Sequence, residues 1–170
     1  MQALETIDLA QHRHFLAIAM EQAEQAALEG TFPIGAVLVG PDGEILAVGR
    51  NRVFTAHDPT AHAEVDVIRQ AGTLLLQPAY KTRCTLYTSN EPCMMCAGAI
   101  MNAGIYRVVW AMTDEHGGAV VQPHAPSPIW HRKYSRLTFL AAPFPEMSQR
   151  QRALLAAFDT KRGADAGRWT

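Results

Sequence analysis

Cysteine is scarce in this sequence, and long hydrophobic runs do not occur in it. The three cysteines are Cys84, Cys93 and Cys96, an odd and sparse set that argues against a disulfide framework and for reduced thiols. No apolar stretch approaches the roughly 20 residues of a membrane span. The first residues also lack the basic and apolar regions of an export signal. These absences predict a cytoplasmic protein that is neither secreted nor embedded in a membrane.

The sequence also has no marked excess of positive or of negative charge. The 15 Lys and Arg nearly balance the 16 Asp and Glu, so bulk charge indicates no nucleic-acid or membrane partner. The segment from His131 onward is locally basic, which fits either an acidic partner or ordinary solvated surface. The length of 170 residues fits one compact domain, residues 1–170.

Alternating helix and strand patterns predict an α/β fold. Helices are expected at 8–29, 61–71, 93–103 and 148–158, and strands at 34–39, 45–48, 84–88, 106–110 and 136–140. A turn at 41–43 makes the first two strands a hairpin, and the later strand–helix–strand connection requires parallel pairing. Residues 114–133 are rich in proline and glycine and are expected to form a long irregular loop.

A metal site is indicated by three side chains near predicted helix starts. Cys93 and Cys96 form a C-x-x-C at such a start, where the helix dipole favours thiolates. This spacing also serves redox centres, structural zinc sites and buried pairs. His62 opens the preceding helix and is the natural third ligand, although taken alone it fits a capping or surface histidine better. Three protein ligands leave a position for water, as in catalytic zinc sites.

Glu64 follows His62 by two residues. A carboxylate beside the open coordination position can act as a general acid and base. Without the cysteines, Glu64 would be only a favourable acid in the first turn of a helix.

Two motifs together, His62-Ala63-Glu64 and Pro92-Cys93-Met94-Met95-Cys96, resemble those of the cytidine and deoxycytidylate deaminase superfamily. These are zinc-dependent nucleobase and nucleoside deaminases, and the resemblance reaches from about residue 32 to residue 110. It is strongest to guanine or cytosine deaminase-like and tRNA adenosine deaminase-like members. It implies a three-layer α/β/α fold with a five-stranded mixed sheet, a motif-bearing core at about 32–111 and a variable specificity region at about 112–170.

The resemblance also implies roles for individual residues. One zinc ion per chain would be held by His62, Cys93 and Cys96, and would activate water for attack on a ring carbon. Glu64 would carry protons while a cyclic amidine C–N bond is hydrolysed and ammonia leaves. The expected substrate contacts are Phe32, Asn51, Ala63, Asp114 and Trp169. Of these, Asp114 would be a second proton carrier and Trp169 would form a lid over the substrate.

The sequence favours a free guanine-like or cytosine-like base, or a nucleoside, as the substrate. The C-terminal part lacks the dense basic helix common in the tRNA enzymes, and its proline-rich loop departs from their pattern. Wobble adenosine in tRNA is the alternative substrate, and inosine would be its product. A non-catalytic, zinc-stabilised interaction domain is the alternative of another class. A homodimer is expected from the resemblance.

Overall fold

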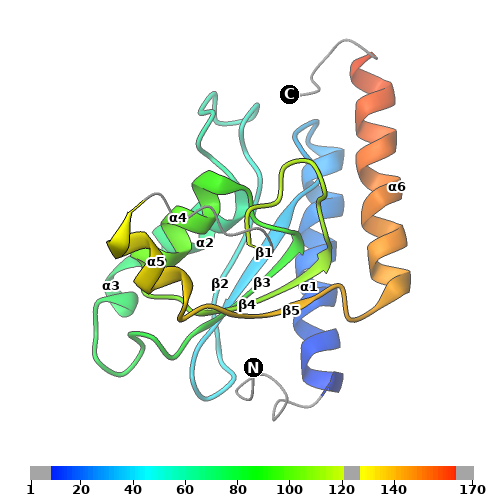
Figure 1. Cartoon of the computed structure of the whole chain (residues 1–170). Helices are drawn as coiled ribbons and strands as arrows, with labels where there is room; N and C mark the ends of the chain where they lie inside the picture. Colours follow the sequence, from blue (N-terminus) through cyan, green and yellow to red (C-terminus); the bar gives the residue numbers. More distant parts are fainter. Residues whose placement is uncertain (1–8, 121–126, 164–170) are drawn as a thin grey trace.

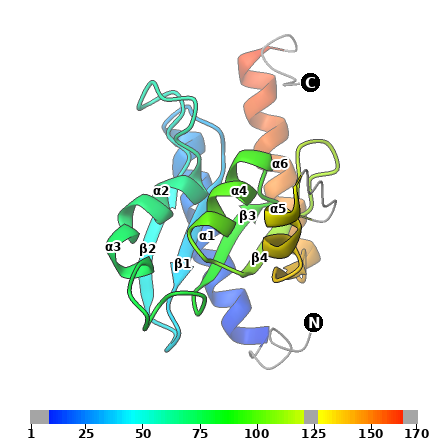
Figure 2. The ribbon, with the colours of Figure 1, turned by 60° about the vertical axis from the view of Figure 1, so that its left-hand side comes forward.

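The computed structural model describes residues 9–120 and 127–163, which form a sheet covered by helices on both faces (Figures 1 and 2). The helices are α1 (Leu9–Leu28), α2 (Ala63–Gln70), α3 (Gly72–Leu75), α4 (Met94–Asn102), α5 (Pro128–Tyr134) and α6 (Pro145–Arg162). The strands are β1 (Gly35–Val39), β2 (Ile45–Arg50), β3 (Thr85–Asn90), β4 (Arg107–Met112) and β5 (Thr138–Ala141). This arrangement confirms the α/β class.

The five-stranded sheet is mixed, with the order β2-β1-β3-β4-β5. β1 pairs antiparallel with both β2 and β3, whereas β3, β4 and β5 run parallel. The predicted hairpin and the predicted parallel half of the sheet are therefore confirmed. Because ligands of such folds bind beyond the carboxyl ends of parallel strands, the ends of β3 and β4 mark the edge where a site is expected.

The helices form one layer on each face of the sheet. α1 and α6 lie side by side on one face, and α2, α3, α4 and α5 cover the other (Figure 1). Each interface holds its own buried apolar cluster, one around Leu86 and Ile100 and one around Leu16 and Tyr87. At Gly35 the backbone of α1 comes so close to β1 that a side chain would collide with the Ala19 carbonyl.

Three helical boundaries differ from the sequence predictions. Residues 128–134, expected as part of an irregular loop, form α5, because Pro128 stands in its first turn, where its fixed φ favours a helix and its missing N–H costs nothing. α3 follows α2 directly at Gly72, which was expected to end the helical segment. α6 is longer than predicted because it begins at Pro145 and continues to Arg162. Among the helices of the described ranges, none is both long and apolar enough to cross a bilayer.

Candidate metal and substrate site

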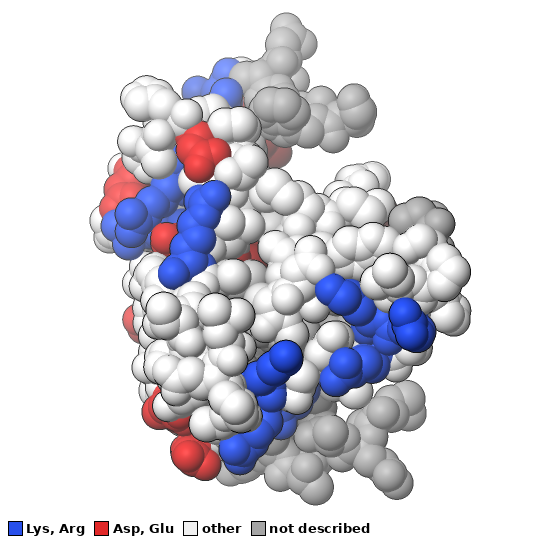
Figure 3. All heavy atoms as spheres, turned by 90° about the vertical axis from the view of Figure 1, so that its left-hand side faces the viewer, with Lys and Arg blue, Asp and Glu red and all other residues white. Residues whose placement is uncertain are grey.

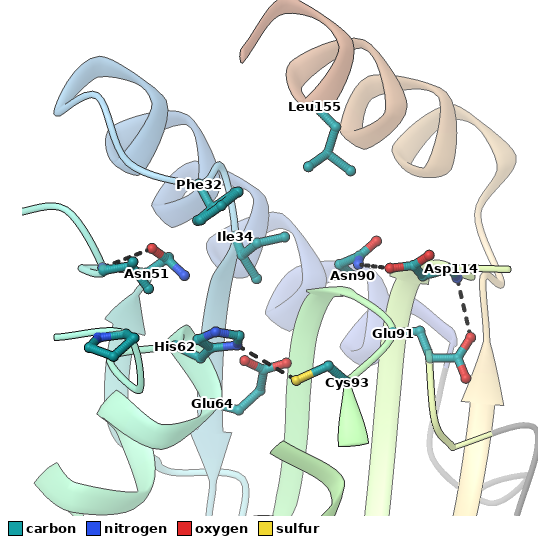
Figure 4. A pocket seen from close by; sticks show the side chains of 12 residues that line it. Phe32, Ile34, Asn51, His62, Glu64, Asn90, Glu91, Cys93, Asp114 and Leu155 are labelled. Carbon is teal, nitrogen blue, oxygen red and sulfur yellow. Dashed lines mark hydrogen bonds between the residues drawn. The ribbon is translucent and has the colours of Figure 1, made fainter. Parts of the chain in front are cut away.

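Two helix starts converge at the carboxyl edge of the sheet. His62 is the N-cap of α2 and Cys93 is the N-cap of α4, and neither side chain caps its own helix with a hydrogen bond. Instead, the two side chains point towards each other in the space between the helices (Figure 4). α4 follows β3 after a short connection. Cys96 comes three residues after Cys93 and therefore lies about one turn farther along α4. The structure thus brings His62, Cys93 and Cys96 together, as predicted.

The three ligand atoms have the spacing of a tetrahedral site. They all lie within 4.8 Å of one another, and His62 Nδ1 is 3.7 Å from Cys93 Sγ and 3.5 Å from Cys96 Sγ. A tetrahedral zinc ion with ordinary Zn–N and Zn–S bonds separates such ligand atoms by about 3.6 Å. One imidazole and two thiols are also a donor set that zinc prefers. The residues present therefore fit zinc.

The pKa values of the three side chains are also compatible with a bound cation. A hydrogen bond from the Cys96 thiol, together with His62, lowers the pKa of Cys93 to about 4. The hydrogen bond to Cys93, followed by burial, raises the pKa of Cys96, and the hydrogen bond to Cys93 raises the pKa of His62. One thiolate thus forms readily, and the second requires a positive ion to offset the charge already gathered there.

Glu64 lies in the first turn of α2, and its carboxyl group lies between His62 and Cys93 in the view of Figure 4. Its side chain is only 2% exposed, and its Oε2 lies 3.4 Å from Cys96 Sγ. Burial raises the pKa of this carboxyl, because a charged carboxylate is poorly solvated there. A raised pKa makes the protonated form of the carboxyl more accessible, and a general acid and base must use both its protonated and its ionised form.

A pocket of about 430 Å³ opens above these residues. Its floor contains His62, Glu64 and Cys93, and its upper wall is formed by Phe32, Ile34 and Leu155 (Figure 4). Leu155 belongs to α6, so the last helix contributes to the pocket. This volume suits a small heterocyclic ligand.

Asn51 lines the pocket on the side of α2. Its Oδ1 accepts hydrogen bonds from Thr31 Oγ1 (2.7 Å) and from the backbone N–H of Val53 (3.0 Å). Because a backbone N–H can only donate, these bonds fix the orientation of the amide and turn Nδ2 towards the pocket (Figure 4). Asn51 is thus a candidate donor to a substrate.

Phe32 stands at the pocket wall and packs on two other rings. Its centroid is 5.3 Å from that of Phe54 and 5.1 Å from that of Phe158. The Arg162 guanidinium lies 4.0 Å from the Phe54 centroid. These contacts hold the C-terminal end of α6 against the loops beside the pocket. They also mean that part of the Phe32 ring packs on protein and is not available to a ligand.

The remaining predicted contacts have different surroundings. Asp114 lines the pocket, but its Oδ1 accepts the backbone N–H groups of His116 and Gly117. Ala63 is fully buried at the start of α2 and is not among the residues that line the pocket. Trp169 lies outside the described residues, so its expected role as a lid stays a prediction.

The sequence analysis missed six residues that line the pocket, and the two polar ones among them are Asn90 and Glu91; the others are Ile34, Val53, Pro59 and Leu155. The buried Glu91 carboxylate accepts backbone N–H groups of Asp114 (3.2 Å) and Val120 (3.1 Å), and so holds the loop after β4 against the metal-binding segment. Asn90 Nδ2 donates to Asp114 Oδ2 over 3.2 Å. Their signal in the sequence was their position between the end of the strand predicted at 84–88 and the C-x-x-C.

Comparisons with known proteins agree with this geometry. A family model described as the cytidine and deoxycytidylate deaminase zinc-binding region matches residues 9–112. The tRNA-specific adenosine deaminase of Agrobacterium fabrum is 43% identical over 112 residues, 66% of this chain and 72% of that enzyme. The tRNA(Ile)-lysidine synthase of Deinococcus deserti is 42% identical over 102 residues, which are 60% of this chain but only 19% of that enzyme's length.

Two solved structures are similar in fold and in sequence. One comes from work on A-to-I editing by tRNA:A34 deaminases and has a TM-score of 0.58 and 44% identity, covering 64% of this chain and 82% of that chain. The other is the guanine deaminase of Bacillus subtilis, with a TM-score of 0.54 and 47% identity, covering 60% of this chain and 64% of that chain. Both matches leave a third or more of this chain uncovered.

Proposed function

This chain belongs to the family of the cytidine and deoxycytidylate deaminase zinc-binding region, and from that premise we propose that it hydrolyses the exocyclic amino group of a purine. One observation carries the proposal: three metal-ligand side chains meet beside a buried carboxyl group at the floor of a pocket. The purine ring is favoured because the similar proteins are named for adenosine and guanine.

His62, Cys93 and Cys96 are the residues that would hold zinc. When bound, zinc lowers the pKa of water and so supplies a nucleophile near neutral pH. The three protein ligands leave room for a water molecule, in contrast to a structural site closed by four. A purely structural zinc role is therefore less well supported than catalysis.

Glu64 moves the protons of the reaction. Its carboxylate takes a proton from the attacking water and passes it to the ring nitrogen beside the reacting carbon. The hydroxyl group added to the ring carbon then gives up its remaining proton, which Glu64 passes to the departing amino group, so that the C–N bond breaks, a C=O bond forms and ammonia leaves. The contact of Glu64 with Cys96, one of the proposed metal ligands, supports this role for Glu64.

Other pocket residues orient the ring. Asn51 offers its Nδ2 to a ring nitrogen or carbonyl oxygen, because its Oδ1 is already engaged. Phe32 supplies an apolar edge at the wall. The backbone at Ala63 and the side chain of Asp114 remain proposed contacts.

The curated relatives favour adenosine in tRNA over the free base that the sequence analysis put first. An RNA substrate needs Lys and Arg near the pocket to neutralise phosphates. On the face formed by α2 to α5, basic side chains occur in separate groups with uncharged surface between them (Figure 3). The last turn of α5 supplies one basic group, with His131, Arg132 and Lys133.

A free guanine-like base is the second candidate, and the upper wall of the pocket favours it. Leu155 of α6 lies over the pocket (Figure 4), and an apolar side chain there suits a small ring better than an extruded nucleotide with its charged backbone. The 47% identity to the B. subtilis guanine deaminase supports this candidate too. We accordingly propose that residues 112–170, which include α6, carry substrate specificity.

We also propose a homodimer in a reducing compartment such as the cytoplasm. The α4 and α5 layer exposes apolar side chains, with Met94 60% and Ile129 58% exposed, and such a patch is a candidate interface. Reduced thiols are required because Cys93 and Cys96 must both be free to bind a metal. Sedimentation of the full chain tests the dimer.

The experiment is a deamination panel with the zinc-loaded protein. Ammonia release is measured with guanine, adenine, cytosine, cytidine and adenosine, and inosine formation with a tRNA that has adenosine at the wobble position. Turnover of tRNA alone supports the first candidate, and turnover of guanine supports the second. If zinc-loaded protein turns over none of them, the proposed function is wrong.

A further inference from the structure

We propose that Gln151 of α6 is a positioning residue, which fixes the upper wall of the pocket by holding Leu155 over the segment 32–34. This inference rests on the proposed deaminase function and goes beyond it, because it assigns a part in substrate binding to a residue that does not itself line the pocket. It is carried by a buried hydrogen bond between α6 and the pocket wall.

Gln151 is completely buried, although much of α6 is exposed. The other buried residues of this helix are the apolar Met147 and Phe158. Gln151 Nε2 donates to the Pro33 carbonyl oxygen over 2.8 Å, and the contacting atom must be Nε2 because a carbonyl oxygen can only accept. Within the described ranges Oε1 has no partner. Burial of an amide is costly unless it is hydrogen-bonded, so the bond to Pro33 decides where this side chain can lie.

The segment that accepts this bond carries two residues of the pocket wall. Pro33 lies between Phe32 and Ile34, and both of these line the pocket. The Phe32 carbonyl accepts the N–H of Ile34 over 2.7 Å, so that Pro33 is the middle residue of a tight turn. The Ile34 carbonyl accepts the N–H of Asn51 over 2.9 Å, which joins the segment to the proposed substrate donor. Gln151 therefore attaches α6 to a segment that is itself held in place.

The same face of α6 carries the residue that reaches the pocket. Leu155 comes four residues after Gln151, and residues at this spacing share a helix face. Leu155 points from α6 over the pocket (Figure 4). A shift of α6 by one residue along its axis would displace Leu155 by about 1.5 Å and would break the bond to Pro33. The hydrogen bond thus sets the position of Leu155 above the pocket.

The other contacts of α6 are less able to fix its position along its axis. Two ion pairs join it to α1, Arg13–Glu146 and Arg150–Glu24. Their side chains are between 37% and 56% exposed, and exposed ion pairs contribute little. Apolar contacts have no preferred direction. The buried amide is the directional contact, and buried polar residues are known to specify the register of packed helices at a cost in stability.

The test compares Gln151→Met with Gln149→Met in zinc-loaded protein. Methionine is close to glutamine in size but cannot donate a hydrogen bond, and Gln149 is exposed on the same helix, which makes it the matched control. Steady-state kinetics are measured with guanine, adenosine and a tRNA that has adenosine at the wobble position. For each compound that the parent protein turns over, we expect Gln151→Met to raise KM roughly tenfold, since an apolar contact to the ring is misplaced. It should leave kcat within about twofold of the parent value, because the lost contact is not specific to the transition state. Gln149→Met should change neither constant.

Two further measurements show whether Gln151 acts through the pocket wall. Leu155→Ala should raise KM to a similar extent, and Gln151→Met added to Leu155→Ala should raise it by less than about twofold more, because changes that act through one contact are not additive. Amide hydrogen exchange reports the wall without any turnover. The N–H groups of Ile34 and Asn51 should exchange faster in Gln151→Met than in Gln149→Met.

Three results overturn the inference and leave deamination intact. They are a Gln151→Met protein that is less stable in urea but has an unchanged KM, an equal rise in KM from Gln151→Met with and without Leu155, and an unchanged KM in Leu155→Ala. The last result needs no variant of Gln151, so a folding defect in that variant cannot hide it. Unchanged exchange of both N–H groups would also contradict the inference. Zinc-loaded parent protein that turns over none of the three compounds overturns the proposed function itself, and the inference with it.

Discussion

Cys96 Sγ lies 3.4 Å from Glu64 Oε2, so a metal-ligand thiol on α4 touches the buried acid of α2. The contact joins two residues that are 32 positions apart and come from the starts of different helices. It brings the proposed proton carrier and a proposed metal ligand into one buried cluster, in which Glu64 is 2% exposed. Burial raises the pKa of Glu64, which suits a group that must alternately hold and release a proton.

The substitution Glu64→Gln separates catalysis from structure. The amide has nearly the same shape and can still hydrogen-bond to Cys96, but it cannot exchange a proton. We expect kcat to fall by roughly 10²–10⁴-fold, the usual contribution of general acid–base catalysis. Zinc content and the thermal unfolding midpoint should stay close to those of the parent protein. Ammonia release and metal analysis measure the two effects.

Glu115→Gln is the matched control, because Glu115 is exposed in the loop after β4 and Glu115 does not line the pocket. It should leave kcat unchanged. A Glu64→Gln protein with nearly normal turnover would mean that another group carries the protons.

The zinc ligands should be distinguishable from the third cysteine. Cys93→Ser and Cys96→Ser each remove a thiolate from the donor set, so we expect both proteins to be purified with little zinc. Cys84→Ser should keep its zinc, because Cys84 lies outside the site and its thiol donates to the Tyr80 carbonyl. Chelation of the parent protein should lower its unfolding midpoint, since a ligand at 1,000 times its Kd stabilises by about 4 kcal/mol. Full zinc in both Cys93→Ser and Cys96→Ser proteins would contradict the ligand assignment.

The metal cluster was predictable because its signals are local in the sequence. His62 and Cys93 each stand directly before a helix, and capping and spacing rules identify helix starts. The parallel connection between β3 and β4 then requires those starts to meet at one edge of the sheet. Sequence patterns therefore sufficed to bring Glu64 beside the thiols.

The upper part of the pocket was not predictable in the same way. Leu155 reaches the pocket only because α6 packs beside α1, a tertiary arrangement that no local pattern specifies. Glu91 resembles an ordinary surface acid in the sequence, yet it is 4% exposed and accepts two backbone N–H groups. The orientation of Asn90 likewise depends on Asp114, which comes from another strand end. Specificity is thus harder to infer from sequence than reaction type.

The loop after β4 should tolerate no side chain at Gly118. A Cβ atom there would lie 2.5 Å from both the Asp114 carbonyl oxygen and Glu91 Cδ, so the loop would have to move away from the metal-binding segment. We expect Gly118→Ala to raise KM and to destabilise the protein by about 1–3 kcal/mol, as overpacking usually does. Denaturant unfolding and steady-state kinetics measure these effects.

Gly72→Ala provides the comparison, because a Cβ at Gly72 meets nothing within 4 Å and alanine favours the helix that begins there. This variant should be at least as stable as the parent. Equal stability of the two alanine variants would show that the loop after β4 moves freely.

Tyr87 predicts a specific loss of stability at alkaline pH. Its side chain is 1% exposed, its hydroxyl lies 3.0 Å from His12 Nδ1, and burial raises its pKa to about 12. In the unfolded chain tyrosine titrates near pH 10, so the stabilising contribution is complete below about pH 10 and is lost as the pH rises through about 12. The expected loss is about 3 kcal/mol. Urea unfolding at about pH 9 and about pH 12 should show a smaller decrease for Tyr87→Phe than for the parent protein, because phenylalanine has no proton to lose. An equal decrease in both proteins would assign the alkaline instability to other groups.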